Sequence, residues 1–395
     1  MHELGIRLLE TKMKILPLHA PRSDLLGRYV RTDNTLHSRS TIYSMRFVVV
    51  GAGALGNEVV KNLGLLGVGS VMVIDSDKIE LSNLSRSVFF RPTDCGRPKA
   101  EVLCHSLSSI CPDTRWEFRN CEVADVGLGE LADADLILSC VDNDLARVEA
   151  AWIALRLNIP MADAGLGGPD YWRGRVSFFA GRASACFCCK LSPRRRRELL
   201  ALSLSTGHSC WATSATTAHP STPTMAAIIG ALQVDFGLRC LNEIKTAEGQ
   251  DFKSPTIEIT LDSNSALARF VTPISPGCPF HGASSQRSVP PGHARVSARE
   301  LLDSHGAQAV DLDWPICLDA RCLDCGSDWK PMKRVAWLRR HGVCPLCGSH
   351  RVLENRNISS LDRNSPWVDT PLADLGLPQH HLYAIRSAVG QEGQE

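Results

Sequence analysis

Three glycines that follow an apolar run could hold a phosphate group close to the backbone. Residues 47–50 are Phe-Val-Val-Val, and Gly51, Gly53 and Gly56 follow them in a Gly-x-Gly-x-x-Gly spacing. Glycine lets the backbone approach a phosphate, and free N–H groups at the start of a helix can bind it. Asp75 follows the next apolar run, where a carboxylate can accept hydrogen bonds from a ribose. These residues predict a nucleotide-binding site.

The positions of the apolar residues predict the elements that carry this site. Residues 47–50 and 71–74 are short apolar runs, typical of buried parallel strands. Residues 57–66 between them carry apolar side chains at helical spacing. Similar runs and helical patterns alternate further along the chain. The predicted fold class is therefore α/β, with a Rossmann-like, doubly wound, mostly parallel sheet.

Four polar residues that follow Asp75 in the sequence narrow the choice of nucleotide. Asp77, Asn83, Arg86 and Lys99 all follow it closely. A helix N-terminus already serves the two phosphates of a dinucleotide, so two further cations favour a triphosphate. The alternative for the two cations is that they are solvated surface charges. An NAD-dependent oxidoreductase, which the glycine spacing alone would also fit, gives them no role.

A longer stretch around these residues resembles a known family. Residues 75–86, Asp-Ser-Asp-Lys-Ile-Glu-Leu-Ser-Asn-Leu-Ser-Arg, precede Gly-Arg-Pro-Lys at residues 96–99. This string is similar to the motif of the adenylating enzymes that activate ubiquitin-like proteins. That family includes the molybdopterin- and thiamine-biosynthesis adenylyltransferases and the ubiquitin-activating enzymes. The resemblance covers about residues 28–242.

The resemblance implies a binding site for ATP and Mg²⁺. It assigns the ribose to Asp75 and requires an acid after the fourth strand. Asp142 ends the apolar run 136–141 and supplies that acid as a ligand for the hard cation, with Asp144 as a neighbour that could share the role. The implied ATP-binding residues are Gly51, Gly53, Gly56, Asp75, Asp77, Asn83, Arg86, Lys99 and Asp142.

Two further residues take catalytic roles from the resemblance. Residues 28–31 resemble the Arg-Tyr-x-Arg element of the family, in which the second arginine, here Arg31, reaches the ATP of the partner subunit. This predicts a homodimer; the alternative is a surface arginine. In the ubiquitin-activating branch a nucleophilic cysteine lies on a loop before a long helix, which here implies Cys210. The catalytic residues of the prediction are Cys210, Arg86, Lys99 and Arg31.

The neighbourhood of Cys210 agrees with an exposed, reactive thiol. Residues 204–224 contain few large apolar side chains and predict a loop that crosses the sheet. His208 and His219 could lower the pKa of the thiol or take its proton. An idle surface cysteine is the alternative. In the sulfur-transfer branch such a cysteine forms a persulfide or acyl-disulfide, so this residue does not choose between the branches.

Two sets of cysteines have the spacing of zinc ligands. Cys322, Cys325, Cys344 and Cys347 form two Cys-x-x-Cys pairs at the separation of a zinc ribbon. Four sulfur ligands close the site, so its role is structural. Another set is too widely separated for spacing alone to join it, but the family carries Cys-x-x-Cys at both places. The ligands that the resemblance implies there are Cys186, Cys189, Cys278 and His281, while Cys188 is either packed or a competing ligand.

Composition restricts the remaining choices. Lys and Arg number 43 against 42 Asp and Glu, so no bulk attraction to nucleic acid or a membrane is expected. The chain shows no apolar run typical of a membrane span, and residues 1–25 lack the apolar stretch of a signal peptide. Sixteen cysteines without an export signal favour reduced thiols and metal sites, and hence a cytoplasmic location.

The domain organisation follows from these patterns. A stretch rich in Ser, Pro and Gly ends the adenylation domain. The predicted division is an N-terminal arm (1–40), an adenylation domain with its crossing loop and inserted zinc site (41–281), a linker (282–299), and a C-terminal zinc-ribbon domain with a tail (300–395).

The predicted function is activation of the C-terminus of a ubiquitin-like protein. The acyl-adenylate would pass to a loop cysteine as a thioester and then to a conjugating enzyme. The alternative with the same first step is adenylation of a sulfur-carrier protein for molybdopterin or thiamine synthesis. The extra ribbon resembles what bacterial ubiquitin-like conjugation systems carry, some of which act against phage. A scaffold without catalysis would not need an intact glycine turn.

Overall fold

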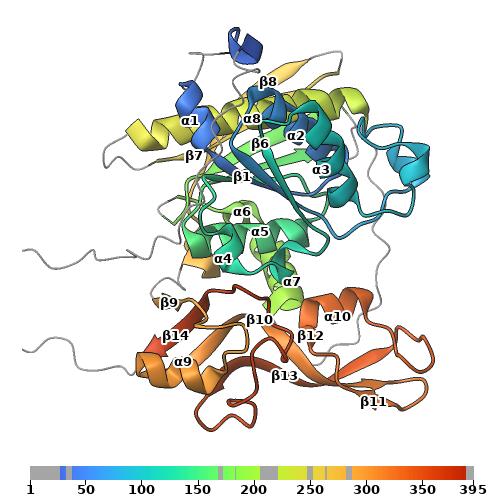
Figure 1. Ribbon diagram of the computed structural model, residues 1–395, viewed down its shortest axis with the longest axis vertical. Coiled ribbons are helices and arrows are strands. Elements are labelled where there is room, and N and C mark those ends of the chain that lie inside the picture. The colour runs from blue at the N-terminus through green and yellow to red at the C-terminus, as the bar shows by residue number, and fades with distance from the viewer. Residues whose placement is uncertain are drawn as a thin grey trace, which may run out of the picture.

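A computed structural model describes residues 27–32, 38–167, 172–182, 184–204, 221–246, 252–262, 265–281 and 287–387. Its larger unit is built on an eight-stranded sheet of order β3-β2-β1-β4-β5-β6-β7-β8 (Figure 1). The first five strands in this order are parallel and the rest are antiparallel. The strands are β1 (Arg46–Val50), β2 (Ser70–Ile74), β3 (Arg115–Arg119), β4 (Leu136–Ser139), β5 (Met161–Leu166), β6 (Arg173–Phe179), β7 (Ser254–Thr260) and β8 (Ala266–Thr272).

Helices cover both faces of this sheet and make three layers. One apolar core lies between the sheet and α1 (Arg39–Ser44), α2 (Ala54–Leu66), α3 (Lys99–Ile110) and α8 (Pro223–Thr246). The other lies against α4 (Leu128–Leu131), α5 (Asp144–Leu157), α6 (Phe187–Lys190) and α7 (Pro193–Leu204). Short 3₁₀ turns occur at η2 (Leu81–Asn83), η3 (Pro92–Asp94), η4 (Val123–Asp125) and η5 (Pro279–His281). The predicted fold class, a doubly wound and mostly parallel α/β sheet, is confirmed.

Helix α8 belongs to the core of the larger unit. By length and composition it could cross a membrane, and among the described residues it is the one helix that could. However, 61% of its apolar stretch is buried inside the molecule. It packs against α2 and the middle strands of the sheet, which accounts for its apolar character.

The second unit is a smaller, six-stranded sheet built around one long strand. That strand, β10 (Ala307–Cys322), pairs antiparallel with β11 (Asp328–Trp329), β12 (Lys333–Arg334), β13 (Val352–Asp362) and β14 (Tyr383–Ser387), and β14 pairs with β9 (Arg287–Val289). Two helices pack on it, α9 (Ala298–His305) and α10 (Val335–His341). Residues 282–299 were predicted as a linker, and this range contains β9 and the start of α9.

A buried charge cluster joins the two units. Arg334, 2% exposed, donates to Asp125 (2.6 Å), Glu149 (3.1 Å) and Glu122 of the larger unit.

A second junction between the units involves Asp313 of the smaller one. Arg156 and the indole N–H of Trp152 both donate to its carboxylate. The smaller unit is thus fixed below α5 and α7, as Figure 1 shows.

Candidate active site

The glycine turn connects β1 to α2 and lies against the loop after β4. Gly51 has a φ of +100°, and its N–H donates to the carbonyl of Ile74 (2.8 Å). A Cβ at Gly51 would lie 2.8 Å from the carbonyl oxygen of Cys140, and one at Gly56 would lie 2.0 Å from the Gly51 oxygen. Both positions therefore exclude any side chain. Gly53 caps α2 without a side-chain hydrogen bond, which suits the binding of an anion at this helix start.

Asp75 lies at the end of β2, beside the turn. Its Oδ2 accepts from the N–H of Ala52 (2.6 Å) and its Oδ1 from the N–H of Asp77 (2.7 Å). Burial raises the pKa of Asp75, while the nearby charge of Lys99 opposes the shift. Lys99 Nζ lies 2.8 Å from Asp77 Oδ2. The structure thus brings the glycine turn, both acids and this lysine together.

The next two predicted residues lie on the segment that follows, around η2. Asn83 Oδ1 accepts from the N–H of Glu80 (3.0 Å), and Arg86 donates to the carbonyl of Ser82 (2.8 Å). Their side chains are engaged within their own segment. The segment is linked to the site because the N–H of Phe89 donates to Oδ1 of Asn57 on α2 (3.3 Å).

Asn57 is a site residue that the sequence analysis missed. It is fully buried, and its amide nitrogen donates to the carbonyls of Ala52 (2.9 Å) and Gly53 (3.0 Å). The same side chain therefore shapes the glycine turn and holds the segment that carries Arg86. An amide on the buried face of an otherwise apolar helix is the signal that could have identified it.

Asp142 lies exposed on the loop between β4 and α5. Its Oδ1 is 3.4 Å from the amide nitrogen of Asn143, the residue that caps α5 through Ala146 (2.8 Å). The loop contacts the glycine turn at Cys140, so Asp142 is on the same edge of the sheet as the turn. Asp144, which could share its role, is instead paired with Arg195 (3.0 Å).

Arg31, one of the predicted catalytic residues, lies outside this cluster. Arg31 is exposed, two residues after Tyr29, whose hydroxyl donates to Asp113 (2.9 Å) and whose ring contacts Arg39. Burial and this hydrogen bond raise the pKa of Tyr29 to about 12. Cys210, with most of the predicted crossing loop, lies outside the described residues. The loop leaves α7 at Leu204 and enters α8, which Thr222 caps by accepting from Met225 (3.2 Å).

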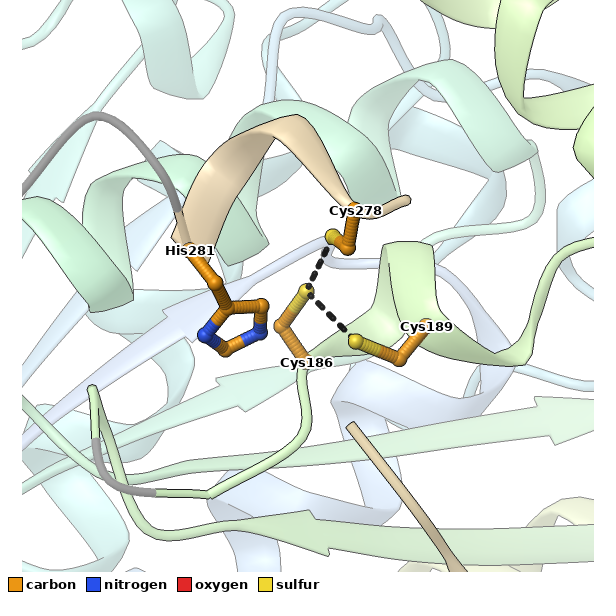
Figure 2. A group of neighbouring side chains, drawn as sticks. All are labelled: Cys186, Cys189, Cys278 and His281. Carbon is orange, nitrogen blue, oxygen red and sulfur yellow. Dashed lines mark hydrogen bonds between the residues drawn. The ribbon is translucent and has the colours of Figure 1, made fainter. Parts of the chain in front are cut away.

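The first predicted set of metal ligands converges between α6 and η5 (Figure 2). The ligand atoms of Cys186, Cys189, Cys278 and His281 all lie within 4.8 Å of one another. Sγ of Cys186 is 3.8 Å from that of Cys189 and 3.6 Å from that of Cys278. Zn–S bonds of about 2.3 Å give tetrahedral S···S edges of about 3.8 Å. Nε2 of His281 is buried and has no hydrogen-bond partner in the described part of the chain, so the donor set fits a zinc ion.

The second set forms a matching group in the smaller unit. Sγ of Cys322 is 3.6 Å from that of Cys347, and Sγ of Cys325 is 3.6 Å from that of Cys344. Each Cys-x-x-Cys segment forms a tight turn that ends at a glycine with positive φ, Gly326 (+72°) in one and Gly348 (+73°) in the other. All four ligand atoms lie within 4.8 Å of one another, which also fits a closed zinc site.

Comparison with known proteins agrees with this geometry. The ThiF family matches residues 31–276. Ubiquitin-like modifier-activating enzyme 5 of Rattus norvegicus is 32% identical over 154 residues, which cover 36% of this chain and 38% of that protein. The Dictyostelium discoideum protein of the same name is 29% identical over 167 residues, 39% and 43% of the two chains. The matches span less than half the length of these relatives.

A solved structure shows the same fold. A crystal structure of E. coli MccB with succinimide has a TM-score of 0.50 at 19% identity, and the match covers 64% of this chain and 73% of that one. The doubly wound sheet, its glycine turn and the acid after β2 define a nucleotide-binding domain. The chain belongs to the ThiF family, which matches more than half of its residues. The predicted family is confirmed.

Proposed function

We propose that this protein uses Mg·ATP to adenylate the C-terminal carboxylate of a ubiquitin-like protein. The observation that supports this most is the grouping of the glycine turn, Asp75, Asp77 and Lys99 beside the loop of Asp142. A triphosphate needs both N–H donors and cations, and the site has both. Two relatives are activating enzymes for a ubiquitin-like modifier by name, which supports the choice of substrate.

In the proposed reaction the residues position the substrate and stabilise charge. Asp75 would bind the ribose, and the start of α2 would bind the phosphates. The partner's carboxylate oxygen attacks the α-phosphorus, the bond to the bridging oxygen breaks, and pyrophosphate leaves. Lys99 and Arg86 would stabilise the charge that gathers on the leaving phosphates. Asp142 would hold Mg²⁺, which neutralises part of the phosphate charge when it is bound.

The second half of the reaction rests on Cys210. The Cys210 thiolate would attack the acyl-adenylate, which forms a thioester and releases AMP. A conjugating enzyme would then accept the acyl group. Arg31 would act on the ATP of the partner subunit, so the working form is a homodimer. The two zinc ions would be structural, because each site has four protein ligands.

Intact-mass measurement tests this proposal. The protein is incubated with candidate ubiquitin-like and sulfur-carrier proteins and Mg·ATP, with and without a thiol reductant. We expect one partner to form an adduct that reductant removes and that a Cys210→Ala variant cannot form. Adenylated partner without an adduct would favour the sulfur-carrier alternative. No adenylate with any partner, although ATP binds, would contradict the proposal.

A further inference from the structure

The loop that carries Asp142 is held by an arginine that the proposed reaction does not use. Arg147 lies on the first turns of α5 and is 6% exposed. Its Nη1 donates to Asp163 Oδ1 (2.7 Å) and to the carbonyl of Ala164 (2.8 Å). Its Nη2 donates to the carbonyl of Val141. One planar guanidinium thus connects the middle of β5 to the residue directly before Asp142.

The partner of this arginine is a buried carboxylate with half of its acceptors unused. Asp163 on β5 is fully buried, and the hydroxyl of Ser139 on β4 donates to its Oδ1 (3.0 Å). Its Oδ2 is also buried and has no hydrogen-bond partner among the described residues. An incompletely satisfied buried ion pair contributes little to stability compared with well-packed apolar residues. Stability alone therefore does not account for the pair.

The same loop is held from the opposite face of the sheet. Gln233 of α8 donates from Nε2 to the carbonyls of Ser139 (3.0 Å) and Ala162 (2.8 Å). Its Oε1 accepts from the thiol of Cys140 (3.4 Å). Arg147 and Gln233 thus hold β5 and the end of β4 from both faces of the sheet, next to the loop.

Two glycines allow the close packing of Arg147 and of the loop that carries Asp142. A Cβ at Gly165 would lie 3.2 Å from Nη2 of Arg147. A Cβ at Gly51 would lie 2.8 Å from the carbonyl oxygen of Cys140, so the glycine turn rests on the loop. The side chain of Asp142 is exposed, and among the described residues it has one long hydrogen bond, from Asn143 (3.4 Å). The backbone of the loop therefore decides where this carboxylate lies.

We propose that Arg147, paired with Asp163, is a positioning residue that sets the loop of residues 140–142, and with it the Asp142 carboxylate, for Mg·ATP. The inference rests on the proposed function, because it needs a nucleotide at this edge of the sheet. Arg147 acts through the carbonyl of Val141 and touches no substrate. Its loss weakens the magnesium-dependent part of nucleotide binding.

The test compares two conservative variants of the same helix. Arg147→Lys keeps the charge but cannot reach all three acceptors. Arg156→Lys is the matched control, because Arg156 also lies on α5 in a buried ion pair, 3.3 Å from Asp313 and away from the loop. Calorimetry measures ATP affinity with excess Mg²⁺ and with a chelator. We expect at least about tenfold weaker Mg·ATP binding for Arg147→Lys, unchanged metal-free binding, and a change below about twofold for Arg156→Lys.

Hydrogen exchange gives a readout that does not depend on ATP. The amides of residues 141–143 should exchange faster in Arg147→Lys than in wild type, with the rest of the sheet unchanged. If that variant folds poorly, Gly165→Ala displaces the guanidinium without removing it and should weaken Mg·ATP binding in the same direction. Equal Mg·ATP binding by wild type, Gly165→Ala and Arg147→Lys would contradict the role of Arg147 and leave the proposed function unaffected. Absence of ATP binding by the wild type overturns the proposed function as well.

Discussion

Lys99 has surroundings unlike those of an ordinary surface charge. Its side chain is 12% exposed and its amine is paired with Asp77 (2.8 Å) beside the buried Asp75. Arg97, two residues earlier, is 48% exposed and pairs with Asp94 on its own turn (2.9 Å). A solvated surface charge therefore describes Arg97 better than it describes Lys99.

These two cations give a prediction with a built-in control. Replacing Lys99 by Met removes a positive charge from the proposed phosphate site, so the rate of adenylation should fall by about 10²-fold or more. Arg97→Met removes an exposed charge and should leave the rate within about twofold. The measurement is the initial rate of pyrophosphate release with a partner protein. Equal rates for both variants would show that Lys99 has no role in the reaction.

At the scale of elements, the unit β1–α2–β2 could be predicted because every local signal agrees. Apolar runs marked both strands, and the glycines marked the turn between them. The last strand of the large sheet could not be predicted in this way. β8 lies at the edge and exposes apolar residues such as Leu267 (67%) and Phe270 (44%), so alternation gives no buried face.

The long strand of the smaller unit was also missed. β10 contains Pro315 and several aspartates, which local propensity disfavours in strands. The structure accommodates the proline at a register shift between Asp311 and Ile316. The role of Asp163 could not be predicted from its own strand. Its partner, Arg147, lies on another element, and local sequence does not show that pairing. Joining Cys278 to Cys186 likewise required the family resemblance.

Adjacent cysteines of α6 allow a direct test of the first zinc site. Cys189→Ser removes a proposed ligand, whereas Cys188→Ala changes a neighbouring buried thiol outside the ligand group. The two ligand groups found among the described residues predict two bound zinc ions per chain, which elemental analysis can count. We expect the first variant to lose one zinc and to melt at a lower temperature.

The control should keep both zinc ions. Loss of zinc from Cys188→Ala with retention in Cys189→Ser would instead show that Cys188 is the ligand. Equal zinc content in all three proteins would remove both cysteines from the site.

The junction at Asp313 predicts how pH affects the attachment of the two units. Burial alone would raise the pKa of Asp313, but the hydrogen bond from His381 (2.9 Å) and the charge of Arg156 outweigh it and lower the pKa. A carboxyl whose pKa is lowered by folding stabilises the fold above its unfolded pKa of about 4, and that stabilisation is lost as the pH falls through the folded pKa.

Asp313→Asn should therefore melt below wild type at pH 7. The difference between the two melting temperatures should shrink as the pH falls below about 4, because the wild-type carboxyl becomes protonated. Calorimetry over this pH range, on wild type and variant side by side, measures the difference and cancels any effect of acid on zinc. A gap that stays constant with pH would contradict this role for Asp313.

For the whole molecule, the smaller unit is positioned by charge and aromatic contacts together. Arg334 inserts among Glu122, Asp125 and Glu149, and burial raises the pKa of Glu149 while Arg334 opposes the shift. Trp152 bridges the units, since its ring lies 5.0 Å from Phe280 and 6.5 Å from Trp314. Phe280 belongs to the turn that carries His281, so the first zinc site supports this junction.

The proposed homodimer can be tested by mixing two inactive variants. Arg31→Ala keeps an intact pocket but lacks its arginine, and Asp75→Asn keeps the arginine but spoils its own pocket. If Arg31 acts on the partner subunit, half of the dimers after random mixing are mixed and each has one working pocket of two, which restores about a quarter of wild-type activity. A mixture without activity, at a native mass of twice 43.1 kDa, would show that Arg31 does not act across subunits.

The most direct measurement of the central claim is exchange of labelled pyrophosphate into ATP. Only reversible formation of an acyl-adenylate at the proposed site links the two compounds, so exchange must require both Mg²⁺ and the partner's free C-terminus. We predict exchange with the intact partner, none with a partner lacking its last residue, and none with Asp75→Asn. Exchange that persists with the truncated partner, or its absence although wild type binds ATP and partner together, would contradict the account.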